Sequence, residues 1–287
     1  MKGSKLAVAV LGDVGGQTKV YEEALRSIGV DPDKGILPKD LDLIQVGDVV
    51  RMNPSPHLDS RGCMEISDRL LRNNPGRFVQ LLGNHDLALL GGAHDPHWKI
   101  EDLPVSRFIL EQWWSEKLPS LAVSLSSSVG DDDDILVTHA GMGYNYWKSV
   151  SGADALETAK ALNARVGTNV PDWEVPGHLV TGVDNPDADT AWALVGAEFH
   201  ATWIDREMPF NQIHGHACML HWDTKEFWPG VPDTVKAMTT LNMEDRYTVT
   251  YRPDGRWVRS VDWILQNDPI DFEWPVLILP DHEITAS

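Results

Sequence analysis

The order of apolar and polar positions in the first ninety residues predicts alternating strands and helices. Apolar runs at 6–11, 42–46 and 77–82 have the length of buried strands. Between them, the apolar residues of 18–28 and 63–71 recur at a spacing that places them on one face of a helix. This alternation is typical of α/β folds, and we expect that class here.

Polar loops follow five of the apolar runs, including runs before residues 138 and 214. The loops are GDVGG, GDVV, GNHD, THAG and HGHA, and their ligand-type side chains are Asp13, Asp48, Asn84, His139 and His216. In open α/β folds, ligands bind beyond the carboxyl ends of the strands, where such loops converge. One aspartate after a strand is an ordinary turn or helix-capping residue, but five loops of this kind predict a common site.

Two long segments between the loops have a different character. Residues 87–130 and 142–205 are rich in tryptophan and partly helical, and we expect them to be insertions that cover the site. Short β segments in 237–265 predict a second sheet packed on the first. We find no linker, so we expect one domain over 1–287. Most of the twelve tryptophans should serve packing, and one or two near the insertions could stack on a nucleobase.

The composition argues against some classes of function, among them binding of extended nucleic acid. The chain of 287 residues is 42 % apolar and 23 % charged, as in ordinary globular proteins. Its formal net charge of −19 argues against binding of extended nucleic acid, which depends on Lys and Arg. No apolar run approaches the length of a membrane span. Two cysteines are too few for a disulfide framework, so we expect the cytoplasm.

The ligand-type residues predict the kind of metal. Carboxylate oxygen, amide oxygen and imidazole nitrogen together suit divalent Mn, Fe or Zn, whereas sets made only of oxygen suit Mg or Ca. A carboxylate such as Asp48 can bridge two cations about 3.5–4 Å apart, the spacing used for in-line displacement at phosphorus. The sequence therefore predicts a metal-dependent phosphoester hydrolase.

The five motifs, in this order, resemble the signatures of the calcineurin-like metallophosphoesterases, and GNHD is the most diagnostic of them. RMNPSPHLDS at 51–60 resembles a segment of the protein phosphatase and diadenosine tetraphosphatase branch. The resemblance implies a two-sheet α/β sandwich flanked by helices, with helical insertions. It makes Asp13 a ligand of the first metal and Asp48 the bridge, with Asn84, His139 and His216 completing the second metal.

The resemblance also assigns catalytic residues. His85 would stabilise the transition state or protonate the leaving oxygen, and Asp86 would orient it. A proton donor with a pKa near 7 suits that role. The family's aspartate after GDxx is replaced by Arg51, which could contact substrate phosphate or reach solvent.

The chain departs from the family pattern at the first metal. Gly15 stands where the family has a histidine, and Cys218 stands where a second histidine often follows His216. Cys218 could ligate through its thiolate or only pack, and Gln17 is a weaker candidate. We therefore expect one tight and one weaker metal site.

Several alternatives stay open at this point. His214 competes with His216, which we favour because it follows the glycine as in the family. Other histidines, including His200 and His221, are expected at the surface or in covering segments. The substrate could be a small phosphomonoester or phosphoanhydride, such as a nucleotide, or a phosphoprotein. The same centre could cleave phosphodiesters of cyclic or dinucleotides, and a degenerate member would bind a nucleotide or a protein without activity.

Overall fold

The computed structural model describes residues 6–52, 57–100, 103–127, 134–150, 152–244, 246–261 and 275–286. Its strands are β1 Ala7–Leu11, β2 Leu41–Gln45, β3 Phe78–Gln80, β4 Ala122–Ser127, β5 Ile135–Thr138, β6 Asn211–His214, β7 Leu220–His221, β8 Glu226–Phe227, β9 Thr239–Asn242, β10 Tyr247–Tyr251, β11 Trp257–Ser260, β12 Leu277–Pro280 and β13 His282–Ala286. They form a four-stranded sheet in the order β12-β1-β2-β3, a seven-stranded sheet in the order β13-β4-β5-β6-β11-β10-β9, and the hairpin β7-β8.

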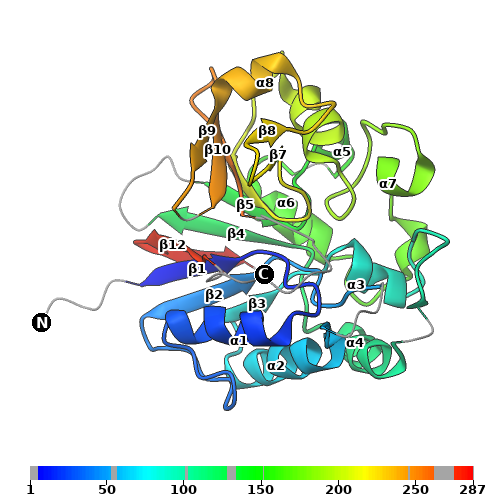
Figure 1. Ribbon diagram of the computed structural model, residues 1–287, viewed down its shortest axis with the longest axis vertical. Coiled ribbons are helices and arrows are strands. Elements are labelled where there is room, and N and C mark those ends of the chain that lie inside the picture. The colour runs from blue at the N-terminus through cyan, green and yellow to red at the C-terminus, as the bar shows by residue number, and fades with distance from the viewer. Residues whose placement is uncertain are drawn as a thin grey trace, which may run out of the picture.

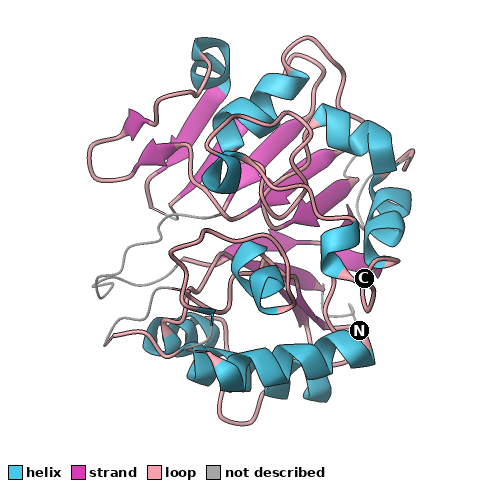
Figure 2. Ribbon diagram, turned by 90° about the vertical axis from the view of Figure 1, so that its right-hand side faces the viewer, coloured by secondary structure: helices cyan, strands magenta, loops and turns pink. Residues whose placement is uncertain are grey.

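The helices lie outside the two large sheets, which form the inner layers (Figure 2). They are α1 Thr18–Ser27, α2 Ser60–Asn73, α3 Asn84–Leu89, α4 Pro104–Glu116, α5 Tyr144–Val150, α6 Ala155–Asn163, α7 His178–Thr181 and α8 Asp233–Met238, with shorter turns η2 Val170–Asp172, η3 Val195–Phe199 and η4 His200–Trp203. The expected two-sheet α/β sandwich flanked by helices is confirmed, with α1, α2 and α4 beside the smaller sheet (Figure 1).

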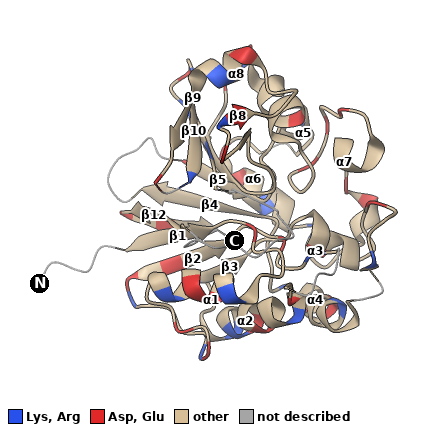
Figure 3. Ribbon diagram, in the orientation of Figure 1, with Lys and Arg blue, Asp and Glu red and all other residues tan. Residues whose placement is uncertain are grey.

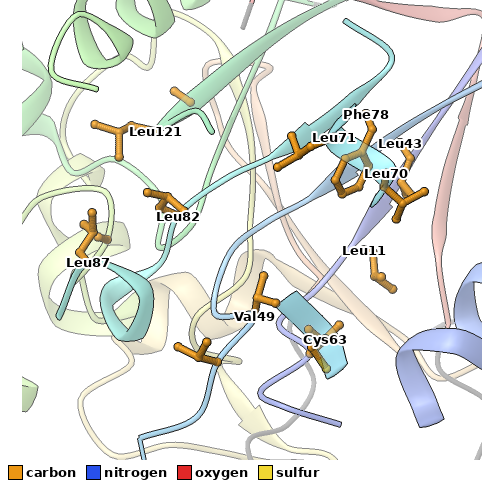
Figure 4. Packing of buried hydrophobic residues seen from close by; sticks show 14 of the residues in the cluster. Leu11, Leu43, Val49, Cys63, Leu70, Leu71, Phe78, Leu82, Leu87 and Leu121 are labelled. Atoms are coloured by element: carbon orange, nitrogen blue, oxygen red, sulfur yellow. The ribbon is translucent and has the colours of Figure 1, made fainter. Parts of the chain in front are cut away.

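Successive side chains of β1 pack into two different apolar clusters, one on each face of the sheet. Val8 and Val10 belong to the apolar cluster shared by the two sheets, whereas Ala9 and Leu11 belong to the cluster under the helices. Successive side chains of a strand point to opposite faces, so an uninterrupted apolar run serves a strand buried on both sides. On the helix side, residues such as Leu43 pack with Leu70 of α2 (Figure 4).

The first half of the chain follows the predicted pattern closely. Strands β1, β2 and β3 are parallel, and α1 and α2 connect them. The helix α2 begins three residues earlier than the apolar spacing indicated, because the Asp59 carboxylate accepts a hydrogen bond from Gly62 N and caps it. Residues 53–56 of the family-like 51–60 segment lie outside the described residues.

Together, the segments 87–130, 142–205 and 237–265 contain strands of the larger sheet as well as helices and loops. Within 87–130, α4 packs near α2, but β4 pairs with β5 and β13 and is part of the larger sheet. The described part of 142–205 consists of helices and loops. The predicted β segments of 237–265 are present as the antiparallel strands β9, β10 and β11. The organisation into a single domain with insertions stays a prediction.

Charged side chains are distributed over the helices with both signs interleaved. On α1 and α2, basic and acidic residues alternate (Figure 3), and several form exposed pairs such as Arg61 with Glu65 at 2.7 Å. Exposed pairs of this kind contribute little to stability. None of the helices in the described part of the chain has both the length and the apolar character of a membrane span.

Candidate metal centre

Five candidate ligands follow five strands of the two sheets. Asp13 follows β1, Asp48 follows β2, Asn84 follows β3, His139 follows β5 and His216 follows β6. Within each sheet the strands concerned are parallel, so their carboxyl ends lie at one edge. All five side chains are buried. Packing of the two sheets brings the edges together on the side where α3 begins (Figure 1).

His139 lies at the centre of this group. Its Nδ1 is 2.9 Å from the carbonyl oxygen of Val46, and because a carbonyl can only accept, Nδ1 carries the hydrogen and Nε2 keeps its lone pair. Burial and the neighbouring His216 hold the pKa of His139 well below its usual value, so the ring is neutral. A neutral imidazole whose orientation is set by a carbonyl is the usual form of a metal ligand.

Three further ligand atoms surround Nε2 of His139. Nδ1 of His216 lies 3.1 Å away, Oδ1 of Asn84 3.2 Å away and Oδ1 of Asp48 3.6 Å away. The amide and carboxylate oxygens cannot donate to the nitrogen, so lone pairs face one another. A divalent ion about 2.1 Å from each ligand would place tetrahedral ligands roughly 3.4 Å apart. The donor set and its spacing therefore fit one divalent cation.

The same residues stand out among all the His, Cys, Asp and Glu of the described chain. Ligand atoms of Asp48, His139 and His216 lie within 4.8 Å of one another, and all three residues are buried. Burial lowers the pKa of His216 to about 3, so this ring is also neutral. Its Nε2 has no hydrogen-bond partner among the described residues.

Asp13 lies against the same cluster from β1. Its Oδ1 accepts a hydrogen bond from the main-chain nitrogen of His216 at 3.2 Å and lies 3.7 Å from Nδ1 of His139. This position suits a second cation that shares Asp48, as the sequence predicts. Ligation by Asp13 stays a prediction.

Two of the candidate ligands occupy unusual backbone conformations. Asp48 has φ +52° and His216 has φ +63°, in the left-handed region that residues other than glycine seldom adopt. Such conformations cost free energy and cluster at functional sites. Neighbouring glycines give the ligands room: a Cβ on Gly83 would lie 2.1 Å from Asp48 Oδ1, and one on Gly215 would lie 2.5 Å from Asp13 Oδ1.

Asp86 supports this backbone. Its Oδ2 accepts hydrogen bonds from the main-chain nitrogens of Asp48 at 2.8 Å and Gly83 at 3.0 Å, and its Oδ1 lies 3.5 Å from Val50 N. These contacts fix the loop that carries Asp48. The predicted role of Asp86 in orienting His85 stays a prediction, since the hydrogen bonds given above all go to main-chain amides.

Known proteins provide a comparison for this geometry. No protein-family model matches the chain. It is 24 % identical to a symmetrical bis(5'-nucleosyl)-tetraphosphatase from Acidovorax sp. (strain JS42), covering 85 % of this chain and 96 % of the relative. Among solved structures, it resembles a mutant of a cold-active protein tyrosine phosphatase, with a TM-score of 0.51, 17 % identity, and 90 % and 78 % of the two chains covered. It also resembles a protein serine/threonine phosphatase from Saccharomyces cerevisiae, with a TM-score of 0.51, 13 % identity, and coverage of 99 % and 82 %.

The chain has the metallophosphoesterase fold. The family resemblance of the five motifs is thus confirmed at the level of the fold. By name, the relative is a tetraphosphatase and the two solved structures are phosphatases.

In this metallophosphoesterase fold, His85 lies beside the candidate ligand Asp48. Its main-chain nitrogen donates to Asp48 Oδ1 at 3.0 Å, and its Nε2 lies 3.9 Å from Asp48 Oδ2. Its Nδ1 accepts from Met52 N at 3.3 Å, so the hydrogen of the neutral ring is on Nε2. Burial and the positive charge of Arg51 hold the pKa of His85 well below its usual value, in contrast to the value near 7 expected for a proton donor. The ring stacks on Trp98 at 4.2 Å.

The residues that depart from the family pattern have other contacts. Gly15 donates from its main-chain nitrogen to the Asp48 carbonyl at 2.8 Å and has φ +50°. The Cys218 thiol donates to the carbonyl of Leu220 at 2.9 Å. Gln17 is largely buried at the start of α1. Ligation by Cys218 or Gln17 and substrate contact by Arg51 stay predictions.

Some positions differ from expectation or were not recognised. His214, the alternative to His216, is buried and its Nδ1 lies 2.9 Å from the carbonyl of Gly215. His200, expected at the surface or in a covering segment, lies in η4 within the covering segment 142–205, where it is 1 % exposed and its ring centre is 4.7 Å from that of Phe199. Trp98 was one of many tryptophans in the insertions, and no signal in its spacing distinguishes it.

Proposed function

We propose that this chain hydrolyses phosphoesters with the help of divalent metal ions held by its own residues. The observation that carries the proposal is the convergence of ligand atoms of Asp48, Asn84 and His216 within 3.1–3.6 Å of Nε2 of His139. The proposed substrates are small phosphorylated molecules, with phosphomonoesters and phosphoanhydrides favoured over extended nucleic acid.

Different residues of the chain would hold each of two metal ions. Asp48, Asn84, His139 and His216 would hold a divalent ion of the Mn, Fe or Zn class, and Asp13 with Asp48 a second. When bound, such ions supply charge neutralisation for the phosphoryl group and lower the pKa of a water molecule.

His85 is proposed to donate a hydrogen bond from Nε2 to the leaving oxygen. Its ring is held by Met52 N on one edge and by Trp98 on one face. Arg51 is half-buried, and its positive charge acts on His85, so it is proposed to bind a phosphate oxygen of the substrate. Both roles need the side chains to be positioned before substrate binds, because phosphoryl transfer depends mainly on positioning and charge neutralisation.

The named substrate of the Acidovorax relative favours nucleoside phosphoanhydrides within this class. A phosphodiesterase remains the second candidate, since the same donor set serves both reactions. Parallel assays with p-nitrophenyl phosphate and bis-p-nitrophenyl phosphate distinguish them.

The test of the proposal is Asp48→Asn, with the exposed Asp187→Asn as the control. Protein purified without chelator should contain Mn, Fe or Zn by mass spectrometry and release phosphate from the substrate panel. Asp48→Asn should lose most of the metal and nearly all activity, whereas the control should match the unaltered protein. Full metal content with more than about a tenth of activity would contradict the role of Asp48. Metal binding without any hydrolysis would favour the degenerate, binding-only alternative.

A further inference from the structure

A cavity of about 560 Å³ opens beside the metal centre. His216, Ala217 and Cys218 form its wall on the side of the metal ligands, and the hairpin β7-β8 with the following loop forms another wall. Its volume is within the range of sites for small organic ligands, roughly 300–1,000 Å³. Because one metal ligand is part of its lining, a group held there would be next to the reacting phosphate.

Tryptophans on the hairpin side give the cavity its chemical character. Trp222 is 3 % exposed and its Nε1 has no hydrogen-bond partner among the described residues. A buried indole N–H normally finds an acceptor, so its isolation indicates a place for one from a ligand. His221 also lines the cavity, and its buried Nδ1 has no partner among the described residues.

Trp228 provides an exposed ring in the same wall. It is 47 % exposed and lies edge to face with His221, with ring centres 5.7 Å apart. Its main-chain nitrogen donates to the carbonyl of Met219 at 2.9 Å, which fixes the loop that carries it. A large ring that stays half exposed at the mouth of a cavity is available for stacking on a planar ligand.

Charge determines which end of a phosphoester would enter. None of the residues lining the cavity is Lys or Arg, and its rim contains the pair His178 and Asp184, with Nδ1 and Oδ1 2.8 Å apart. A phosphate would therefore find no cationic partner inside, whereas the metal centre at the other end is built for it. The uncharged part of the substrate would occupy the cavity.

We propose that this cavity binds the nucleobase of a nucleoside phosphate substrate, with Trp228 stacked on the base and Trp222 Nε1 donating to a ring nitrogen or carbonyl. A planar heteroaromatic group with acceptor atoms matches both tryptophans, whereas an aliphatic alcohol would offer Trp228 no planar face and a phenyl ring would offer the Trp222 N–H no acceptor. The assignment rests on the proposed function for the placement of the phosphate, and it narrows the substrate class to nucleotides.

The test compares binding of AMP and ribose 5-phosphate, which has a hydroxyl in place of the base, by calorimetry on Mn-loaded protein carrying His85→Ala to slow turnover, and the variants below are made in this background. AMP should bind at least about ten-fold more tightly than ribose 5-phosphate, as one stacked base implies. Trp228→Ala should remove most of this difference, and Trp228→Phe should restore part of it. Trp222→Phe, which keeps a ring but not the donor, should weaken AMP several-fold. Tyr251→Ala is the matched control, an exposed aromatic on β10 that does not line the cavity.

Equal binding of the two ligands, or equal loss of both in Trp228→Ala, would overturn the assignment. The outcome is separate from that of the hydrolase proposal because binding is measured in the His85→Ala background, whereas hydrolysis is measured on the unaltered protein. If Trp228→Ala removes a preference for AMP but the unaltered protein hydrolyses no phosphoester, the assignment of the cavity stands and the hydrolase proposal fails. Hydrolysis of p-nitrophenyl phosphate without any preference for AMP over ribose 5-phosphate would do the reverse.

Discussion

Substitution of Asp86 tests which interactions hold the loop of the candidate metal ligand Asp48 in place. The carboxylate of Asp86 is buried, and its Oδ2 accepts from two main-chain amides, those of Asp48 and Gly83, while Oδ1 is 3.5 Å from a third. We compare Asp86→Asn, which keeps the shape but loses the charge, with Asp86→Ala, which loses the acceptors altogether. Stability is measured on chelator-treated protein, so that bound cations do not contribute.

The asparagine variant should be nearly as stable as the unaltered protein. The side-chain oxygen of the asparagine can take the place of Oδ2. Its NH₂ group then takes the place of Oδ1, which makes the longest of the three contacts, to Val50 N. Loss of the charge weakens each retained hydrogen bond by about 1 kcal/mol, or roughly 2 kcal/mol for two. In the other direction, burial raises the pKa of Asp86 to about 6 even though its hydrogen bonds to main-chain amides lower it, so burial disfavours the charged carboxylate and offsets the weaker hydrogen bonds of an asparagine. We therefore expect a change within about 1 kcal/mol.

The alanine variant should behave differently. Two buried main-chain amides, of Gly83 and Asp48, lose their acceptor, and each costs about 1–3 kcal/mol, so unfolding free energy should fall by roughly 2–6 kcal/mol. Asp48 is held at φ +52° partly by this contact, so Mn affinity should fall as well.

Urea unfolding followed by circular dichroism gives the free energies, and calorimetric titration gives Mn affinity. The exposed Asp187→Ala serves as the control for removing an aspartate. Two results would refute the reasoning. If Asp86→Asn is as unstable as Asp86→Ala, the acceptor geometry is not what matters. If Asp86→Asn keeps its stability and metal but loses about 10²-fold or more in kcat, the charge of Asp86 acts on His85, as the motif alone suggested.

Three further predictions concern other parts of the site and its cover. His85→Ala should lower kcat by roughly 10²–10⁴-fold with metal content unchanged, and loss of metal would instead identify His85 as a ligand. The protein as purified should carry nearer one metal than two, and Gly15→His should raise the Mn stoichiometry measured by mass spectrometry, at a cost of roughly 1–2 kcal/mol for a side chain at φ +50°. Two tightly held metals in the unaltered protein would contradict this account. Burial raises the pKa of Asp189 from 3.8 to about 7, so the folded state keeps a proton that the unfolded state has lost, and unfolding free energy should fall as pH rises from about 4 to 7. Asp189→Asn should flatten that fall in urea titrations across this range, and an unchanged slope would refute the assignment.

Local sequence determined the framework of this protein and the identity of its candidate ligands. Strands β1, β2 and β5 and helices α1 and α2 occur where the spacing of apolar residues predicts them. These elements depend on interactions within a few residues, on burial of one face and on turns at glycine, all of which are visible along the chain. The five polar loops were recognisable for the same reason, because each is a short motif at a strand end.

Only the tertiary structure decided how these residues meet. Val46, which sets the tautomer of His139, is 93 residues away along the chain, and Asp13, which accepts from the His216 amide, is 203 residues away. The strand β4 joined the larger sheet although its segment was expected to be an insertion. No local pattern encodes such pairings, because they depend on how two sheets pack across their shared apolar layer.

Because packing of distant segments is not visible along the chain, the sequence did not show which tryptophans line the cavity or where the Asp86 carboxylate points. Trp222 and Trp228 are two of twelve tryptophans, and their spacing does not distinguish the ring that packs from the ring that borders a cavity. Asp86 is adjacent to His85 in sequence, but the start of α3 turns its carboxylate towards the main chain of Asp48 and Gly83. Residue type and position specified the chemistry available to this protein, and the packing of distant segments specified which atoms face one another.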